Sequence, residues 1–203
     1  MNKNRFEAFS DGVFAIAITL LILEIHVPEP QSGVPGGGLT QSLLSLWPLY
    51  LSYAACFATI GIMWMNHHAL FHDVESVTHA ILLVNLLLLL LVAFLPFPLD
   101  VVSRYGITTQ TMRFLGLLFL LISVVYGVLY YISSPAIPKP HTLRGYLTAW
   151  TGWNSVGPIG YLVAIAVAPL APAVSLLLYA LIAAYYATPI LRGRLTRGAT
   201  TGR

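Results

Sequence analysis

Residues 77–95 read VTHAILLVNLLLLLLVAFL, an almost entirely apolar run. About 20 consecutive apolar residues are enough to cross the hydrocarbon core of a bilayer as one α-helix. Pro96 and Pro98 follow directly, and proline interrupts helical hydrogen bonding, so the helix is predicted to stop there. This stretch is therefore interpreted as a transmembrane helix, and further transmembrane helices are expected in the rest of the chain.

The composition of the whole chain also indicates that the protein folds in a lipid bilayer. Of the 203 residues, 58% are hydrophobic and only 8% are charged, whereas a soluble domain carries about a quarter charged residues. A chain of this size cannot hide so much apolar surface from water in one core. We therefore expect lipid as the solvent and a single compact bundle without a second domain.

Five further segments have the length and apolarity of membrane helices, and stretches rich in proline or glycine separate them. They are expected at residues 6–27, 41–71, 111–132, 143–167 and 174–191. Pro48 is expected to kink the second of the six helices. The predicted fold class is an all-α, polytopic membrane protein with six transmembrane helices in residues 1–191. Residues 192–203 are basic and are expected to form a flexible cytoplasmic tail.

The basic residues predict the orientation of these helices. Cytoplasmic loops are enriched in lysine and arginine, so both chain ends are placed in the cytoplasm. The inside segments then hold Lys3, Arg5, Lys139, Arg144, Arg192, Arg194, Arg197 and Arg203, and the outside segments hold Arg104 and Arg113. The net charge of +3 does not indicate a nucleic-acid partner, because the basic residues lie in loops and chain ends. The expected location is the cell inner (plasma) membrane, with multiple passes.

Two clusters of polar residues interrupt the apolar pattern, and an ionisable group within a membrane segment usually has a role. They comprise Arg5, Glu7, Ser10 and Asp11 in the first helix, and Asn66, His67, His68, His72 and Asp73 at the end of the second. Both fall at the cytoplasmic end, so they can meet in an interhelical polar network. Apolar residues follow Asp11 as far as Leu23, so its carboxylate needs a partner, and Arg5 or a histidine is expected to provide one.

The histidines also raise the possibility of a metal site. His68 and His72 are four residues apart and share one helix face, with His67 and Asp73 nearby. Imidazole and carboxylate groups can ligate zinc or iron, but no second histidine cluster completes the set. The chain also carries no Gly-rich phosphate loop, serine elbow or paired-cysteine motif. No metal, cofactor or enzymatic activity is therefore predicted, and a membrane-embedded metalloenzyme using His67, His68 and His72 is the least favoured alternative.

The first helix carries an aliphatic stripe. At about 100° per residue, Ile16, Leu20 and Leu23 fall within about 60° of one another, with Thr19 at the edge. Asp11 lies about 140° from Ile16, so it is expected to point elsewhere, into the bundle. Such a stripe can face lipid, pack in the core or, around a symmetry axis, form stacked apolar rings that gate ions by dewetting. Periodicity alone does not choose among these.

Two motifs resemble a known family. The stretch from Arg5 to Asp11 resembles the Arg-x-x-x-Phe-Ser-Asp signature of the transmembrane protein 175 potassium-channel family, and residues 64–71 (WMNHHALF) are also similar to that family. The resemblance implies a potassium-selective leak channel without the usual Thr-Val-Gly-Tyr-Gly filter, which this sequence lacks. Prokaryotic members with a single six-helix repeat form tetramers, so a homotetramer in the lipid bilayer is implied here.

The resemblance also implies site residues. In the family the first helix lines the pore, which gives Ile16, Leu20 and Leu23 as the constriction and Thr19 as a selectivity residue. The implied structural polar network comprises Arg5, Ser10, Asp11, Trp64, Asn66, His67 and His68. Between the two adjacent histidines, His68 is favoured as the network member, because it lies one turn beyond Trp64.

The expected function is passive potassium conduction along an axis lined by the first helix, with monovalent cations as the permeant species and only modest selectivity over sodium. Glu24 and Glu29 at the outer end could concentrate cations. A secondary transporter is the main alternative, since transporters often contain broken helices around a midplane site. The segment at residues 143–167 is interrupted by Gly and Pro, but it has no matching partner in the chain.

Overall fold

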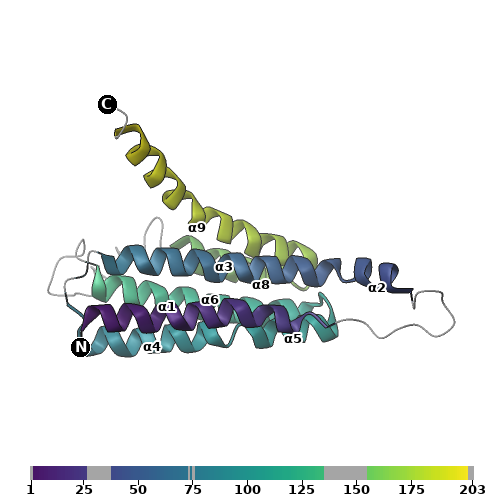
Figure 1. The fold of residues 1–203 in the computed structure, drawn as a ribbon. Coiled ribbons are helices and arrows are strands. Elements are labelled where there is room, and N and C mark those ends of the chain that lie inside the picture. Colours follow the sequence, from purple (N-terminus) through teal and green to yellow (C-terminus); the bar gives the residue numbers. More distant parts are fainter. Residues whose placement is uncertain (1, 27–37, 73, 75, 135–154, 201–203) are drawn as a thin grey trace.

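The computed structural model describes residues 2–26, 38–72, 74, 76–134 and 155–200, without the side chains of residues 188–200. All elements in these ranges are helical, and most of them run along a common long axis, from which the C-terminal helix slants away (Figure 1). The elements are α1 (Lys3–Leu20), the 3-10 helix η1 (Leu21–Glu24), α2 (Leu39–Ser45), α3 (Trp47–His72), α4 (His79–Ala93), α5 (Pro96–Tyr105), α6 (Thr109–Ser133), α8 (Val156–Val167) and α9 (Pro172–Thr200). The all-α prediction is thus confirmed for the described residues.

Four helical segments of the described chain are long and apolar enough to cross a membrane. They are Lys3–Glu24, Trp47–His72, His79–Tyr105 and Thr109–Ser133. Val156–Val167 and Pro172–Ala187 are shorter apolar helices. Residues 143–154, the first part of the predicted fifth span, lie outside the described residues. Because α9 continues to Thr200, the predicted tail at residues 192–203 begins within a helix. The flexibility of this tail stays a prediction.

Prolines shape two of the long segments. The predicted kink near Pro48 is a break at Leu46, where α2 ends and α3 begins. The prediction that Pro96 ends the third helix was only partly right. The helix α4 does end at Ala93, but Pro96 is the first residue of α5. Proline suits the first turn of a helix, because the amide hydrogen that it lacks has no intrahelical acceptor there.

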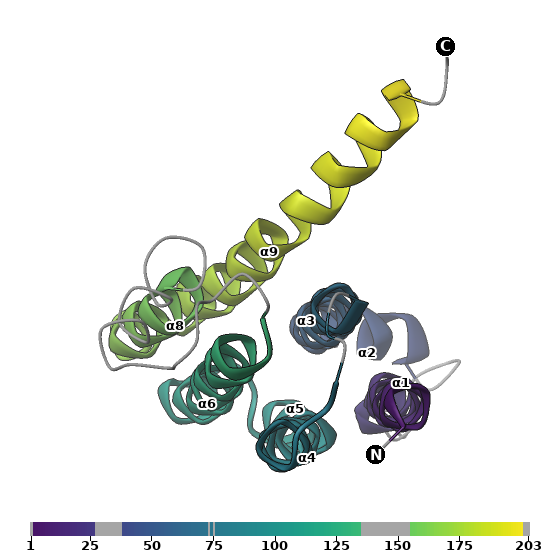
Figure 2. The same cartoon turned by 90° about the vertical axis from the view of Figure 1, so that its left-hand side faces the viewer.

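The six longest helical segments form a ring, within which α6 also contacts α9 and α3. Going round, α1 contacts α3, α3 contacts α9, α9 contacts α8, α8 contacts α6, α6 contacts α4, and α4 returns to α1. Figure 2 shows this arrangement from the end at which α1 begins, with α1 at the edge of the bundle. Only one side of α1 is therefore covered by its own chain.

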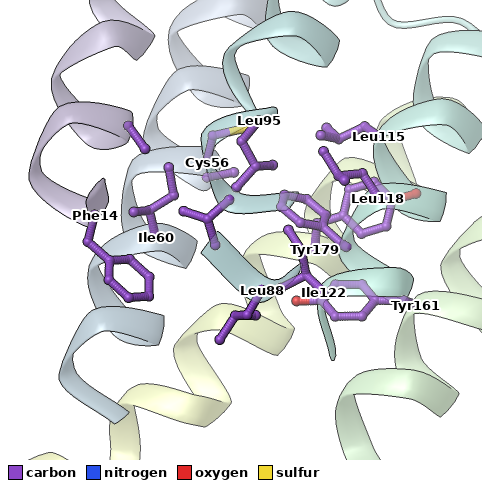
Figure 3. Packing of buried hydrophobic residues seen from close by; sticks show 14 of the residues in the cluster. Phe14, Cys56, Ile60, Leu88, Leu95, Leu115, Leu118, Ile122, Tyr161 and Tyr179 are labelled. Carbon is purple, nitrogen blue, oxygen red and sulfur yellow. The ribbon is translucent and has the colours of Figure 1, made fainter. Parts of the chain in front are cut away.

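The core fills the centre of this ring. Aliphatic and aromatic side chains from several helices meet there, including Phe14, Ile60, Leu88 and Tyr179 (Figure 3). Close approach of α6 and α9 depends on Gly116, because a Cβ atom at this position would clash with the hydroxyl of Tyr179. That hydroxyl donates to the Met112 carbonyl oxygen at 2.8 Å. The contact between α6 and α9 thus combines a glycine with a tyrosine whose hydroxyl has a hydrogen-bond acceptor.

Candidate functional site

The helix α1 and the 3-10 helix η1 that continues it have two contrasting faces. Buried residues recur every three or four positions, as expected for one side of a helix. They are Phe6, Ser10, Phe14, Ala17 and Leu21. The opposite side is open, since the exposed fractions are 61% for Ile16, 41% for Leu20 and 66% for Leu23. Thr19 is exposed as well. The predicted stripe is therefore not part of the core of its own chain.

A chain of buried hydrogen bonds fixes the covered side of α1. The Nε2 atom of His67 on α3 donates to Oδ1 of Asn85 on α4 at 2.8 Å. The Nδ2 atom of Asn85 donates to Oγ of Ser10 on α1 at 3.0 Å, and Ser10 Oγ donates to the Phe6 carbonyl oxygen at 3.0 Å. His67, Asn85 and Ser10 are each at most 1% exposed. Three helices are thus joined through groups that have no water to bond to instead.

A second link lies beside the first on α1. The indole Nε1 of Trp64 donates to Oδ1 of Asp11 at 2.8 Å, and the ring of Trp64 stacks on His68 with centroids 6.1 Å apart. The expectation that Arg5 or a histidine pairs with Asp11 was therefore wrong. Trp64 is on the same helix as the histidines but one turn earlier, and its indole N–H is a donor that needs an acceptor in an apolar setting.

The two adjacent histidines take different positions. His67 is the residue hydrogen-bonded to Asn85, and its ring packs against Phe14 and Phe71 at centroid distances of 5.4 and 4.7 Å. His68 is exposed and contacts Trp64. His68 was favoured as the network member, but the histidine that bonds to Asn85 is His67, and His68 reaches the network only through its contact with Trp64. Successive residues point about 100° apart on a helix, and the rotation of α3 decides which of the two faces α1.

Two predicted network members stand apart. Arg5 and Asn66 make no side-chain hydrogen bond or ion pair with any residue that the structure describes. Arg5 is exposed, and Asn66 faces a cavity between α3 and α6. Their membership of the network stays a prediction.

The sequence interpretation missed Asn85 and Lys3. Asn85 is the single amide within the apolar run at residues 77–95, and a polar residue inside a membrane segment was the signal that could have identified it. Lys3 Nζ donates to the carbonyl oxygen of His72 at 3.0 Å and lies 3.8 Å from Glu7 Oε1. A cation is favourable at the carboxyl end of a helix, so Lys3 ties the start of α1 to the end of α3.

The histidines do not form a metal site in the described part of the chain. No group of three or more His, Cys, Asp or Glu side chains is placed to hold an ion there. His67 points toward Asn85, and His68 packs on Trp64. Asp73, which the sequence brought close to them, lies outside the described residues.

The end of the stripe at Leu23 adjoins acidic side chains. Leu20, Leu23 and Glu24 line a hollow together with Asp100 and, from the neighbouring helix pair, Ala93, Phe94, Pro96 and Phe97. Arg104 Nε donates to Asp100 at 2.7 and 2.9 Å, so this carboxylate already has a cation. Glu24 is half-buried, and Glu29 lies outside the described residues.

Comparisons with known proteins agree with these features. Residues 5–96 match the profile of the family described as endosomal/lysosomal potassium channel TMEM175. A potassium channel of Chamaesiphon minutus is 44% identical over 167 residues, which is 80% of this chain and 82% of that protein. A potassium channel of Streptomyces collinus is 50% identical over 106 residues, about half of each chain.

A solved structure extends the likeness to the fold. The crystal structure of a lysosomal potassium-selective channel TMEM175 homologue from Chamaesiphon minutus superposes with a TM-score of 0.78 at 40% identity. The superposition covers 92% of this chain and 97% of that one. The similarity therefore includes the helices beyond the profile match, up to the C-terminal part of the bundle.

Proposed function

The chain belongs to the TMEM175 family of potassium channels, and from this premise we propose that it is a potassium-selective leak channel with a pore lined by α1. The Chamaesiphon and Streptomyces relatives are named potassium channels, and the family comprises ion channels rather than enzymes. Potassium is the permeant ion, moving passively down its electrochemical gradient. The pore lies on the symmetry axis of a homotetramer.

The observation that carries this proposal is the uncovered aliphatic side of α1. Ile16, Leu20 and Leu23 are exposed in the single chain, while the opposite side of the helix is anchored by Ser10 and Asp11. Brought around an axis, the three residues make stacked apolar rings spanning about 10 Å at 1.5 Å per residue. Rings of this kind restrict ion passage by dewetting.

Thr19 lies beside this stripe and is the proposed selectivity residue. Its hydroxyl is within hydrogen-bonding distance of the carbonyl oxygens of Ala15 and Ile16, at 3.0 and 2.9 Å, so its hydrogen points back to its own helix. The lone pairs of Thr19 Oγ1 then remain available to a cation. Selectivity over sodium is modest, because few other oxygens line this side of α1.

The proposed topology has six crossings with both ends in the cytoplasm of a cell whose inner (plasma) membrane holds the protein. It is supported by the eight-to-two distribution of basic residues derived above. It is also supported by α9, which runs back toward the end of the bundle at which α1 begins (Figure 1). In this topology α8 and α9 belong to the fifth and sixth crossings.

The experiment that tests the proposal is a flux assay on reconstituted protein, combined with a mass measurement of the assembly. We expect potassium efflux that exceeds sodium efflux. This efflux should not saturate and should need no coupled ion, and the conducting particle should contain four subunits. Flux that saturates and requires a second ion would favour a secondary transporter instead. A monomeric particle with full flux would refute the shared pore.

A matched pair of variants tests the selectivity residue. Thr19→Val keeps the side-chain shape but removes the oxygen, so the potassium-to-sodium permeability ratio should fall. Thr59→Val makes the same change on α3, where the hydroxyl bonds to the Ala55 carbonyl oxygen away from α1, and should leave the ratio unchanged. Equal ratios in the wild type and Thr19→Val would remove Thr19 from the selectivity mechanism.

A further inference from the structure

A cavity of about 400 Å³ lies within the subunit, between α3, α6, α8 and α9. It lies away from the exposed side of α1, since none of its lining residues belongs to that helix. On α3 it extends from Thr59 to Leu70, which is about 16 Å along the helix axis at 1.5 Å per residue. Its volume lies within the range of about 300–1,000 Å³ typical of small-molecule sites.

Three tyrosine hydroxyls on the cavity wall lack hydrogen-bond partners among the described residues. They belong to Tyr126, Tyr130 and Tyr161. Tyr161 is only 5% exposed, and its ring is held by stacking on Phe119 at a centroid distance of 5.4 Å. Tyr126 and Tyr130 are half-buried. A buried hydroxyl without a partner is costly, so Tyr161 in particular indicates that something in the cavity bonds to it.

The rest of the wall defines the chemistry of the occupant. Apolar groups predominate, among them Ile62, Met63, Leu70, Phe119 and Ile122, and no Asp, Glu, Lys or Arg is present among the described lining residues. A charged ligand would lose its hydration without gaining a counter-charge. Water in the cavity would mostly contact apolar side chains, and cavities lined by apolar groups tend to stay dry.

We propose that this cavity binds a small neutral amphiphile, with an aliphatic body against the apolar wall and one hydroxyl or carbonyl group bonded to the tyrosine hydroxyls of the wall, that of the buried Tyr161 above all. A medium-chain alcohol has this chemistry. Tyr161 supplies the hydrogen bond, and its position beside Ile122 is visible in Figure 3.

The occupant contacts α3 on a side different from the one that holds α1. Thr59, Met63, Asn66 and Leu70 recur at helical spacing and face the cavity. His67, which anchors Ser10 through Asn85, projects from another side of the same helix. A bound amphiphile therefore packs against the helix that positions α1.

Photolabelling tests this proposal directly. Purified protein in lipid nanodiscs is irradiated with a diazirine derivative of 1-decanol, and the labelled residues are mapped by mass spectrometry. We expect saturable labelling of peptides that contain Tyr126, Tyr130 or Tyr161, competed by 1-decanol. Decanoate should compete at least about ten-fold more weakly, because its charge has no partner in the cavity. Equal competition by the two would overturn the proposed neutral chemistry.

Matched variants separate the cavity from the lipid-facing surface. Ala183 lines the cavity and is 4% exposed, whereas the adjacent Ala184 is exposed. Ala183→Phe should abolish saturable labelling, and Ala184→Phe should preserve it. Tyr161→Phe, which changes no volume at the wall, should weaken competition by about five-fold through loss of one hydrogen bond. Labelling that is unsaturable, or unchanged in both Ala183→Phe and Tyr161→Phe, would show that the cavity has no such ligand.

Discussion

Replacing Asn85 with leucine should be among the most destabilising single changes in the polar anchor of α1. The Asn85 side chain bonds to His67 at 2.8 Å and to Ser10 at 3.0 Å, and all three residues are buried. Leucine is similar in size, so the packing changes little, but both hydrogen bonds are lost. Ser10 keeps its bond to the Phe6 carbonyl oxygen, whereas the Nε2 hydrogen of His67 is left without an acceptor.

The magnitude follows from these two losses. A hydrogen bond between membrane helices contributes about 0.6 kcal/mol on average, which applies to the bond with Ser10. A buried donor without an acceptor costs about 1–3 kcal/mol, which applies to His67 at 1% exposed. Asn85→Leu should therefore lower the free energy of unfolding by roughly 2–4 kcal/mol.

A double-mutant cycle identifies the source of this loss. His67→Phe removes the orphaned donor and keeps an aromatic ring among Phe6, Phe14 and Phe71. Replacing both partners by apolar groups can be nearly neutral, so adding His67→Phe to Asn85→Leu should recover about 1–2 kcal/mol.

The assay measures reversible unfolding in mixed micelles while a denaturing detergent is titrated into the sample. Asn66→Leu is the matched control, because it makes the same chemical change at a residue without a hydrogen bond to any described residue. It should cost less than about 0.5 kcal/mol. An Asn85→Leu effect no larger than that of Asn66→Leu, or strictly additive effects in the cycle, would refute the reasoning.

Three further predictions concern the pore stripe, the second link and the core. Ile16→Ala should raise potassium flux in liposomes, since it widens the proposed apolar ring; unchanged flux with an intact assembly would exclude Ile16 as the constriction. Trp64→Phe should cost about 1 kcal/mol by removing the donor to Asp11, measured by thermal unfolding, and no loss would mean that the exposed bond is replaced by water. Gly116→Ala should cost about 1–3 kcal/mol, because the added methyl clashes with a tyrosine of α9. Gly61→Ala, whose Cβ meets only one ordinary contact at 3.8 Å, should be neutral or stabilising by up to about 1 kcal/mol; the reverse order of the two glycine variants would contradict the packing described.

The long apolar segments could be predicted from sequence because each contains enough information locally. The expected helix at residues 111–132 corresponds to α6 at Thr109–Ser133, and the one at residues 41–71 ends within one residue of α3. Hydrophobic length decides such spans without knowledge of their neighbours. The restart of the helix at Pro96 was missed, because a proline that ends one helix can equally be the first residue of the next.

The polar anchor could be predicted only in part. Ser10, Asp11 and His67 were correctly brought together, because polar residues at one end of two antiparallel membrane helices have few other partners. The partner of Asp11 and the role of Asn85 depend on how α3 and α4 are rotated about their own axes. That rotation is set by packing across the whole bundle, which no single segment of sequence contains.

The arrangement along α1 suggests why stability and conduction can be separated in this helix. Both hydrogen-bonded links attach to adjacent residues, Ser10 and Asp11, whereas the proposed constriction begins at Ile16, about 7–9 Å further along the axis at 1.5 Å per residue. Hydrogen bonds require fixed geometry, but the contacts of Ala17 and Leu21 beyond the anchor are apolar and tolerate small displacements. A change at the anchor should therefore act mainly on the stability of the bundle. A change in the stripe should act mainly on the width of the pore, because those side chains contribute little to the packing of their own subunit.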